Sequence, residues 1–139
     1  MSGQMLVQNN SAEHVQLDLP SLDTITNGNF SGLSSINIPS LQTCLENLTF
    51  AYNYFTSLSA PNLIDIDSNL SIDSSPELEN ISFPSLSSIG GNFHISNNSH
   101  LLNIDGFGHP WSIGWAACGD NVWIKSGSFV NVAVAGNLI

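Results

Sequence analysis

The sequence predicts an all-β fold, a parallel β-helix-like solenoid with turns of about 22–23 residues over positions 15–107. A Pro-x-Leu anchor recurs four times, and successive prolines are separated by 19, 22 and 23 residues. A shift of 23 residues places apolar residues on apolar residues. No segment carries a long helical stripe, and proline interrupts every turn, which disfavours a helical repeat.

Each turn is expected to follow the same order of elements. The anchors are Pro20-Ser-Leu22, Pro39-Ser-Leu41, Pro61-Asn-Leu63 and Pro84-Ser-Leu86. Three residues after each anchor Leu comes another apolar side chain, in order Ile25, Cys44, Ile66 and Ile89. Before each anchor an apolar pattern recurs over residues 33–38, 55–60 and 78–83, and in part over 101–107. The same apolar positions are therefore filled in successive turns.

Two turns align without a gap. The shift carries Leu63, Ile66, Leu70, Ile72, Leu78 and Ile81 onto Leu86, Ile89, Phe93, Ile95, Leu101 and Ile104. Residues 70–72 and 93–95 alternate apolar and polar, the period of a strand with one buried face. Strands this short are stable only when stacked, so we expect parallel pairing between turns at about 4.8 Å.

One polar position is expected to have a structural role at the bend after each strand. Residues 93–104 fit the leucine-rich-repeat pattern, in which an asparagine side chain bonds the backbone at that bend. Asn98 occupies the asparagine position, and Ser75 occupies it one turn earlier. The turns lack a helical half, which favours a β-helix-like cross-section over a horseshoe.

The repeat resembles a known family. Residues 86–95 and 98–107 resemble receptor L-domains, so the fold is expected to be L-domain-like. The repeated Phe-Pro-Ser-Leu and Gly-Asn-Phe-Ser phrases are similar to fungal cell-wall organisation proteins of the extracellular-mutant and sporulation-specific type. The resemblance implies a secreted, N-glycosylated protein, usually tethered by a glycosylphosphatidylinositol anchor. It also implies a place in the cell wall or on the outer face of the plasma membrane, and no enzymatic activity.

Three segments are expected along the chain. Residues 1–14 form an irregular N-terminal segment, 15–107 the solenoid, and 108–139 a diverged C-terminal turn or cap. The alternation in residues 122–124 and 130–134 allows one or two further strands, while a poorly folded tail remains an alternative. Neither a signal peptide nor an anchor signal is visible, so a partial member of the family is expected.

Composition excludes several functions. The chain has 139 residues, of which 22 are Ser and 17 Asn, while 11 acidic residues face one basic residue, Lys125. Binding of nucleic acid or anionic lipid requires basic side chains, so neither partner is expected. No apolar run is long enough to span a membrane. Solubility is expected to come from hydroxyls, amides and attached sugars.

Six Asn-x-Ser/Thr sequons are candidate N-glycosylation sites. They are Asn9, Asn29, Asn47, Asn69, Asn80 and Asn97. A chain this rich in Asn, Ser and Thr contains about three by chance, so six is a modest excess. Asn47 and Asn69 occupy equivalent places in adjacent turns, which is typical of a shared exposed corner.

The two cysteines, Cys44 and Cys118, are expected to remain unpaired. Cys44 occupies the position of Ile25 and Ile66 in other turns, which predicts a small apolar side chain in the core. A disulfide is the less favoured alternative.

No catalytic, cofactor or metal site is predicted. The first 107 residues contain no Lys or Arg and only three histidines, His14, His94 and His100, which argues against a polysaccharide lyase. An acidic run could hold Ca²⁺ weakly or supply paired carboxylates, but solvated corners explain it more simply. The run comprises Asp65, Asp67, Asp73, Glu77 and Glu79.

Two functions of different classes follow. The first is a non-catalytic structural protein of the fungal cell wall, whose partners are wall polysaccharide or wall proteins. The second is a carbohydrate-binding or carbohydrate-active β-helix.

Overall fold

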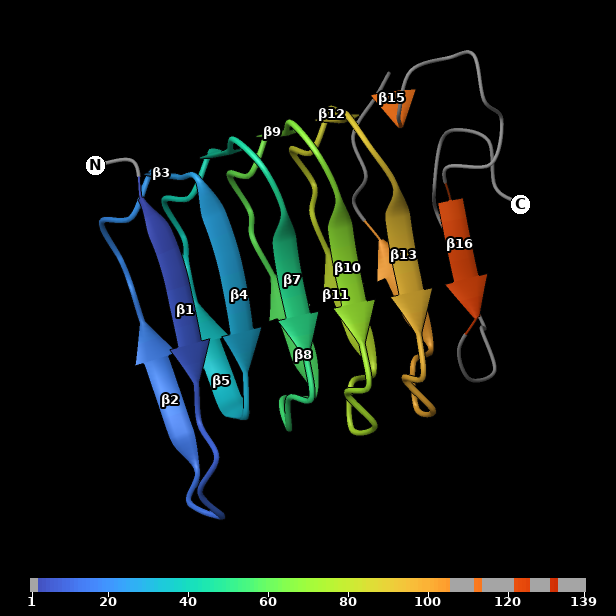
Figure 1. Cartoon of the computed structure of the whole chain (residues 1–139). Coiled ribbons are helices and arrows are strands. Elements are labelled where there is room, and N and C mark those ends of the chain that lie inside the picture. Colours follow the sequence, from blue (N-terminus) through green and yellow to red (C-terminus); the bar gives the residue numbers. More distant parts are fainter. Residues whose placement is uncertain (1–2, 106–111, 114–121, 126–130, 133–139) are drawn as a thin grey trace.

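The computed structural model describes residues 3–105, 112–113, 122–125 and 131–132. Every regular element in these ranges is a β-strand, and all strand pairs are parallel. Within the same ranges there is no helix that could cross a membrane. The chain winds through similar turns and stacks them side by side (Figure 1), which confirms the predicted all-β, β-helix-like solenoid.

The longest sheet contributes one strand from each turn, and it lies at the front of Figure 1. Its order is β1 (Gln4–Gln8), β4 (Asn27–Ser31), β7 (Leu48–Ala51), β10 (Leu70–Asp73), β13 (Phe93–Ser96) and β16 (Val122–Lys125). Apolar residues alternate with small polar ones along these strands, so one face is buried and the other meets solvent.

Shorter strands form the other sides of each turn. One sheet contains β3 (Thr24–Ile25), β6 (Thr43–Cys44), β9 (Asp65–Ile66), β12 (Ser88–Ile89) and β15 (Ser112–Ile113). Another contains β8 (Ser57–Ser59), β11 (Asn80–Ser82), β14 (Asn103–Asp105) and β17 (Asn131–Val132). A final pair joins β2 (Val15–Asp18) to β5 (Leu33–Asn37), with a register shift after Val15.

Backbone register agrees with the predicted 23-residue alignment. Leu70 lies opposite Phe93, and Ile72 opposite Ile95. The same spacing pairs β9 with β12 and β11 with β14. Equivalent apolar side chains therefore lie over one another and form one continuous core. Phe30 and Phe50 stack within it, with ring centroids 5.4 Å apart and an interplanar angle of 17°.

The Pro-x-Leu anchors are tight turns between sheets. The anchor Leu amide donates to the carbonyl three residues earlier, as in Leu41 to Ile38 at 3.3 Å and Leu86 to Phe83 at 3.1 Å. Proline is then the second residue of the turn, where its fixed φ is favoured. The anchor Leu enters the core, with Leu41 and Leu86 both fully buried.

A second corner follows β4, β7, β10 and β13 of the six-stranded sheet, and it requires a left-handed residue. Gly32 (φ 71°), Tyr52 (φ 56°), Ser74 (φ 50°) and Asn97 (φ 54°) occupy it in successive turns. Gly and Asn adopt this conformation readily, whereas a bulky residue such as Tyr is strained there. The turns thus share backbone geometry even where their lengths differ.

Beside this corner, three buried polar side chains form an internal ladder, Asn53, Ser75 and Asn98. Asn98 donates to the Ile72 carbonyl at 3.0 Å and accepts from the Ser75 amide at 2.8 Å. The Ser75 hydroxyl accepts from the Asn53 amide at 3.1 Å. The predicted backbone-bonding role of Asn98 is confirmed, and Ser75 fills the equivalent position.

The chain termini add strands to the predicted solenoid. Strand β1 lies within residues 1–14, for which the sequence indicates no regular element, and pairs with β4. Its alternation of Met5 and Val7 toward the core is short and has no anchor proline, so periodicity alone does not reveal it. Strands β15, β16 and β17 pair with β12, β13 and β14. The domain limits at 14 and 107 remain predictions.

Candidate functional site

The middle of the outward face of the six-stranded sheet is a row of side chains, several of them small and uncharged. Across it, Leu6 lies opposite Asn29, Asn29 opposite Thr49, Thr49 opposite Ser71, and Ser71 opposite His94. Because side chains alternate along a strand, this row points to solvent whenever its neighbours enter the core. Its middle members, Asn29, Thr49 and Ser71, therefore form a regular row of amide and hydroxyl groups, with Leu6 and His94 at its two ends.

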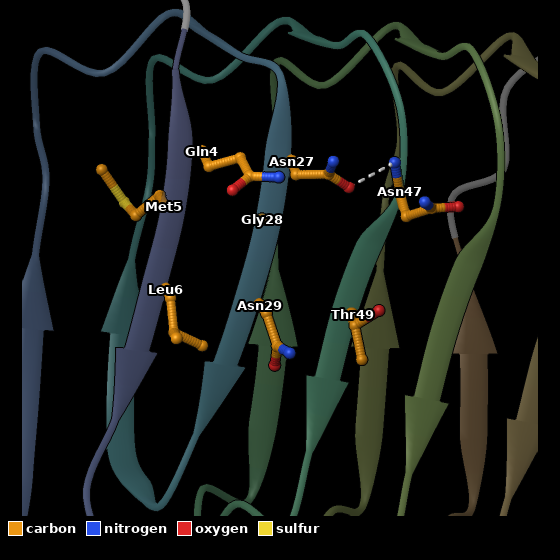
Figure 2. A pocket seen from close by; sticks show the side chains of 8 residues that line it. All are labelled: Gln4, Met5, Leu6, Asn27, Gly28, Asn29, Asn47 and Thr49. Atoms are coloured by element: carbon orange, nitrogen blue, oxygen red, sulfur yellow. Dashed lines mark hydrogen bonds between the residues drawn. The ribbon is translucent and has the colours of Figure 1, made fainter.

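Part of this face is hollowed over β1, β4 and β7. The pocket has a volume of about 420 Å³. Figure 2 shows two rows of side chains along it, one formed by Gln4, Asn27 and Asn47 and the other by Leu6, Asn29 and Thr49. Side-chain amides and one hydroxyl dominate both rows, so the pocket offers hydrogen bonds without a formal charge.

The upper row of side chains in Figure 2 belongs to an external ladder, a series of asparagine side chains that form hydrogen bonds from one turn to the next along the solenoid. The Asn27 side-chain oxygen accepts from the Asn47 amide at 3.1 Å, and the Asn47 oxygen accepts from the Asn69 side chain at 2.8 Å. The Asn69 oxygen accepts from the Asn92 amide at 2.7 Å. These side chains stabilise the corner before each strand, since they satisfy amides that would otherwise need water.

A smaller pocket of about 250 Å³, the bend pocket, lies where the bends after β1, β4 and β7 meet. Tyr52 and Tyr54 line it, with 67% and 57% of their side chains exposed. Amides and hydroxyls from the neighbouring bends complete it, among them Gln8, Asn10 and Ser31. No lining residue of this pocket carries a charge at neutral pH.

Asn9 is one wall of the bend pocket and is fixed by its hydrogen bonds. Its amide nitrogen donates to the Glu13 carbonyl at 3.0 Å and to the Gly32 carbonyl at 2.9 Å. Its oxygen accepts from the Ser11 amide at 3.0 Å. The Asn9 side chain is therefore held in place before any ligand binds, and both of its amide hydrogens are already hydrogen-bonded.

The sequons differ in how their side chains are held. Asn47 and Asn69 are equivalent, as predicted, but they are half-buried in the external ladder rather than at an exposed corner. The Asn80 oxygen accepts from Asn103 at 2.7 Å. Asn97 is exposed and donates to Asp73 at 3.0 Å. Asn29 is exposed on the sheet face, and its side chain has no hydrogen bond within the described residues.

The acidic run is distributed over different sides of the turns. Asp65 accepts from the Ser88 hydroxyl at 2.6 Å, one turn further along. Asp73 accepts from Ser74 at 3.0 Å and also from the Ser96 hydroxyl. In the part of the chain that the structure describes, no three His, Cys, Asp or Glu side chains gather as a metal site.

Hydrogen bonds determine the ionisation of Asp73. Partial burial alone would raise its pKa, but hydrogen bonds from Ser96, Ser74 and Asn97 outweigh this effect, and the His94 charge acts in the same direction. The pKa of Asp73 is therefore lowered from its ordinary value of 3.8. The carboxylate is ionised at neutral pH and links adjacent turns.

The described histidines and Cys44 lie apart from one another and do not form a ligand cluster. His94 is exposed on the sheet face, and His100 lies at a bend with its Nδ1 2.6 Å from the Pro76 carbonyl. Cys44 is free and fully buried between Ile25 and Ile66, as predicted. Burial raises the pKa of its thiol, which disfavours the reactive thiolate. Cys118 lies outside the described residues.

Sequence reasoning missed the bend pocket and one member of the internal ladder. The turn containing Tyr52, Asn53 and Tyr54 is one residue shorter than the next, so Asn53 does not align with Ser75 and Asn98 in a fixed-spacing repeat. The sequence does contain a signal for Asn53, because it follows the inward Phe50 by three residues. Asn98 follows Ile95 by the same offset.

Fold and surfaces together define a class, a β-solenoid whose six-stranded sheet exposes a row of amides and hydroxyls. No family model matches the chain, and no solved structure matches it. It is 31% identical over 111 residues, 80% of its length, to Sporulation-specific protein 2 of Saccharomyces cerevisiae. It is 36% identical over 101 residues, 71% of its length, to a "Cell surface GPI-anchored protein" of Arthroderma benhamiae. Over 81 residues, 58% of its length, it is 37% identical to Protein ecm33 of Aspergillus fumigatus.

The chain is homologous to fungal proteins of the ecm33 and sporulation-specific type, which confirms the predicted resemblance. It spans 22%, 26% and 20% of the length of these three curated relatives. The more specific likeness to receptor L-domains remains a prediction.

Proposed function

We propose that this chain is a non-catalytic structural protein of the fungal cell surface that contributes to cell-wall organisation. The carrying observation is the outward face of the six-stranded sheet, where Asn29, Thr49 and Ser71 form a regular uncharged row. Such a face suits repeated hydrogen bonding to an extended, neutral polymer, because its donors and acceptors recur at the spacing between strands.

The names of the relatives support this proposal. One is a cell-surface anchored protein, and none of the three names describes an enzyme. We propose the cell wall or the outer face of the plasma membrane as the location. Wall polysaccharide or wall proteins are then the partners, with a glycan on an exposed sequon outside this row, such as Asn97.

The test is disruption of the gene in the fungus that encodes the chain, followed by growth on Congo red. Sensitivity to the dye is expected, and the intact gene should restore growth. A gene encoding Thr49→Lys with Ser71→Lys, which puts two cations on the sheet face, should restore less growth than one encoding Ser57→Lys with Ser59→Lys on β8. Normal growth and wall staining of the disrupted strain would contradict the proposal.

A second function, carbohydrate binding, is favoured by the two pockets, both lined mainly by amides, hydroxyls and exposed apolar groups. Binding without turnover is compatible with the structural role, whereas measurable cleavage of a wall polysaccharide would replace it. Incubation with wall glucan and chitin, followed by analysis for released oligosaccharides, distinguishes the two; no release is expected.

A further inference from the structure

We infer that the bend pocket formed around Tyr52 and Tyr54 binds a sugar unit of a neutral, β-linked polysaccharide. This inference rests on the proposed function and gives it a ligand class and a site. The observations that carry it are the exposure of two aromatic rings, the strain at one of them, and the uncharged lining of the pocket.

The strain at Tyr52 has no explanation in the fold itself. The same left-handed corner is occupied by Gly32, Ser74 and Asn97 in other turns, residues without a bulky ring. The backbone of Tyr52 makes the hydrogen bonds of the repeat, accepting from the Gly32 amide at 3.1 Å and donating to the Asp73 carbonyl at 3.1 Å. Any residue could make these bonds. A bulky residue thus occupies a backbone conformation that disfavours it, and residues strained in this way cluster at binding sites.

Because side chains of the bend point alternately outward and inward, the two tyrosine rings face the same pocket. Asn53 between them is fully buried in the internal ladder, and Phe55 enters the core. Tyr52 and Tyr54 consequently project outward and line one pocket. Their hydroxyls have no hydrogen bond within the described residues. An aromatic face with a free polar tip suits a partner with one apolar face and a polar rim.

A sugar ring in a β-linked chain has this character, with C–H groups on its faces and hydroxyls around its edge. The rings of Tyr52 and Tyr54 can stack on the C–H face, while the amides of Gln8 and Asn10 can bond the rim hydroxyls. Gln8 already donates to Asn10 at 3.1 Å, which orients both amides. The volume of about 250 Å³ lies below the roughly 300–1,000 Å³ of drug-sized sites, so it fits a short segment.

The absence of basic groups in the pocket lining and the negative charge of the chain favour a neutral ligand. The lining of the bend pocket has no basic group to hold an anionic sugar, and the chain has a formal net charge of -10. Uronic-acid polymers are therefore repelled. Asn9 commits both amide hydrogens to the wall of the pocket, so it is disfavoured as the carrier of a glycan that would fill the site.

The experiment titrates laminarihexaose and chitohexaose into the full chain, produced without glycans in bacteria, with binding followed by NMR and by tyrosine fluorescence. Saturable binding of at least one of the two is expected, and oligogalacturonate should not bind. The substitution Tyr52→Asn, which copies Asn97, should weaken binding roughly two- to tenfold. It should leave the thermal midpoint unchanged or raise it, because Asn tolerates the left-handed conformation. Tyr54→Ser should weaken binding to a similar degree.

Ile64→Ser is the matched control, since Ile64 is also an exposed large apolar side chain, at 40%, but lines neither of the two pockets. It should bind as the wild type does. Absence of binding by folded wild-type chain, or equal binding by Tyr52→Asn, would overturn the inference and leave the Congo red result unaffected. A disrupted strain with normal walls would instead contradict the proposed function, while measured oligosaccharide binding would still stand.

Discussion

A few buried polar side chains supply the hydrogen-bond partners of backbone groups inside this solenoid. The ladder of Asn53, Ser75 and Asn98 runs through the core beside the left-handed corners. Each member bonds backbone groups that the bend takes out of the strand pattern. Buried backbone groups without partners are costly, so these few amides and hydroxyls fix the shape of the bend.

Removal of Asn53 tests the ladder. Asn53→Ala leaves the Leu33 amide and the Phe30 carbonyl without the bonds of 3.0 Å that they now make. The free energy of unfolding should fall by about 2–4 kcal/mol, measured by urea denaturation. Asn62→Ala, which removes one exposed bond to the Pro39 carbonyl, should change it by at most about 0.5 kcal/mol. Equal effects of the two substitutions would contradict a special role for the ladder.

Asp73 predicts an acid-sensitive contact between turns. Its pKa is lowered from 3.8 in the folded chain, so its ionised form stabilises the fold. This contribution is present above pH 3.8, the ordinary value, and is lost as the pH falls through the lower folded pKa. Asp73→Asn should therefore destabilise the chain at pH 7 and much less at pH 2.

The measurement for Asp73 is the urea midpoint of wild type and Asp73→Asn at both pH values. Asp23→Asn is the control, because the Asp23 carboxylate is exposed and accepts no hydrogen bond within the described residues. A difference between wild type and Asp73→Asn that stays constant with pH would show that the carboxylate makes no ionic contribution.

At the scale of the element, each turn is defined by two corners, one led by proline and one that requires a left-handed residue. The proline corners could be read from the sequence because their residues recur at nearly fixed spacing. The left-handed corners could not, since Gly32, Tyr52, Ser74 and Asn97 share no chemistry. Their common property is a backbone angle, which side-chain identity reveals only for glycine.

The corner at Gly32 holds the first turn to the second. An alanine there would be strained at φ 71°, and its Cβ would overlap the backbone oxygen of Asn9. Gly32→Ala should destabilise the chain by at least roughly 1–2 kcal/mol and release β1. Hydrogen exchange at the Asn9 amide, which now bonds the Ser31 carbonyl at 3.0 Å, measures that release.

Gly3→Ala is the control for Gly32. A Cβ at Gly3, the residue before β1, would meet no atom within 4 Å. Exchange at Asn9 should then stay close to that of the wild type. Unchanged exchange in Gly32→Ala would show that β1 is held by its strand pairing alone.

The sequence predicts the core far better than the candidate site. Six aligned apolar positions suffice to place Leu70 on Phe93 and Ile81 on Ile104, because core burial repeats with the turn. The bend pocket depends on three bends brought together from residues 8–11, 31–32 and 52–54. Gly32 and Tyr52 are equivalent in successive turns, but residues 8–11 lie outside the predicted repeat, so only the stacked structure shows that all three bends line one pocket.

The same limit applies to the sequons. All six share one motif, yet Asn29 is exposed while Asn47 and Asn69 are held in the external ladder. What distinguishes them is the hydrogen bonding of each amide to the next turn. That bonding is a property of register and cannot be read from a three-residue pattern.

The whole molecule combines a strongly acidic surface with strand edges of the kind that pair with other chains. The formal net charge is -10 at pH 7, and the sequence pI is about 4.1. Charge repulsion keeps such edges apart at neutral pH and disappears near the pI. Strand β1 pairs on one side only, with β4, within the described residues.

Self-association should therefore have a maximum near pH 4.1. Light scattering and sedimentation of the full chain between pH 3 and 7 measure it, and added salt at pH 7 should increase association in the same direction. Placing a charge on the edge strand, with Leu6→Lys, should reduce association at pH 4.1, where the substituted lysine is ionised. Scattering that is independent of pH would show that charge does not limit association.

Parallel stacking also sets how the molecule carries tension. Backbone hydrogen bonds between turns lie along the solenoid axis, so a force that pulls the two ends apart acts on them directly and peels one turn from its neighbour. From β7 to β13 the turns repeat every 22 or 23 residues, and each of these turns, once peeled, would extend to roughly 70 Å. A chain of this build would lengthen stepwise under load and dissipate energy at each step, so it would act as an extensible, energy-absorbing link and not as a rigid strut.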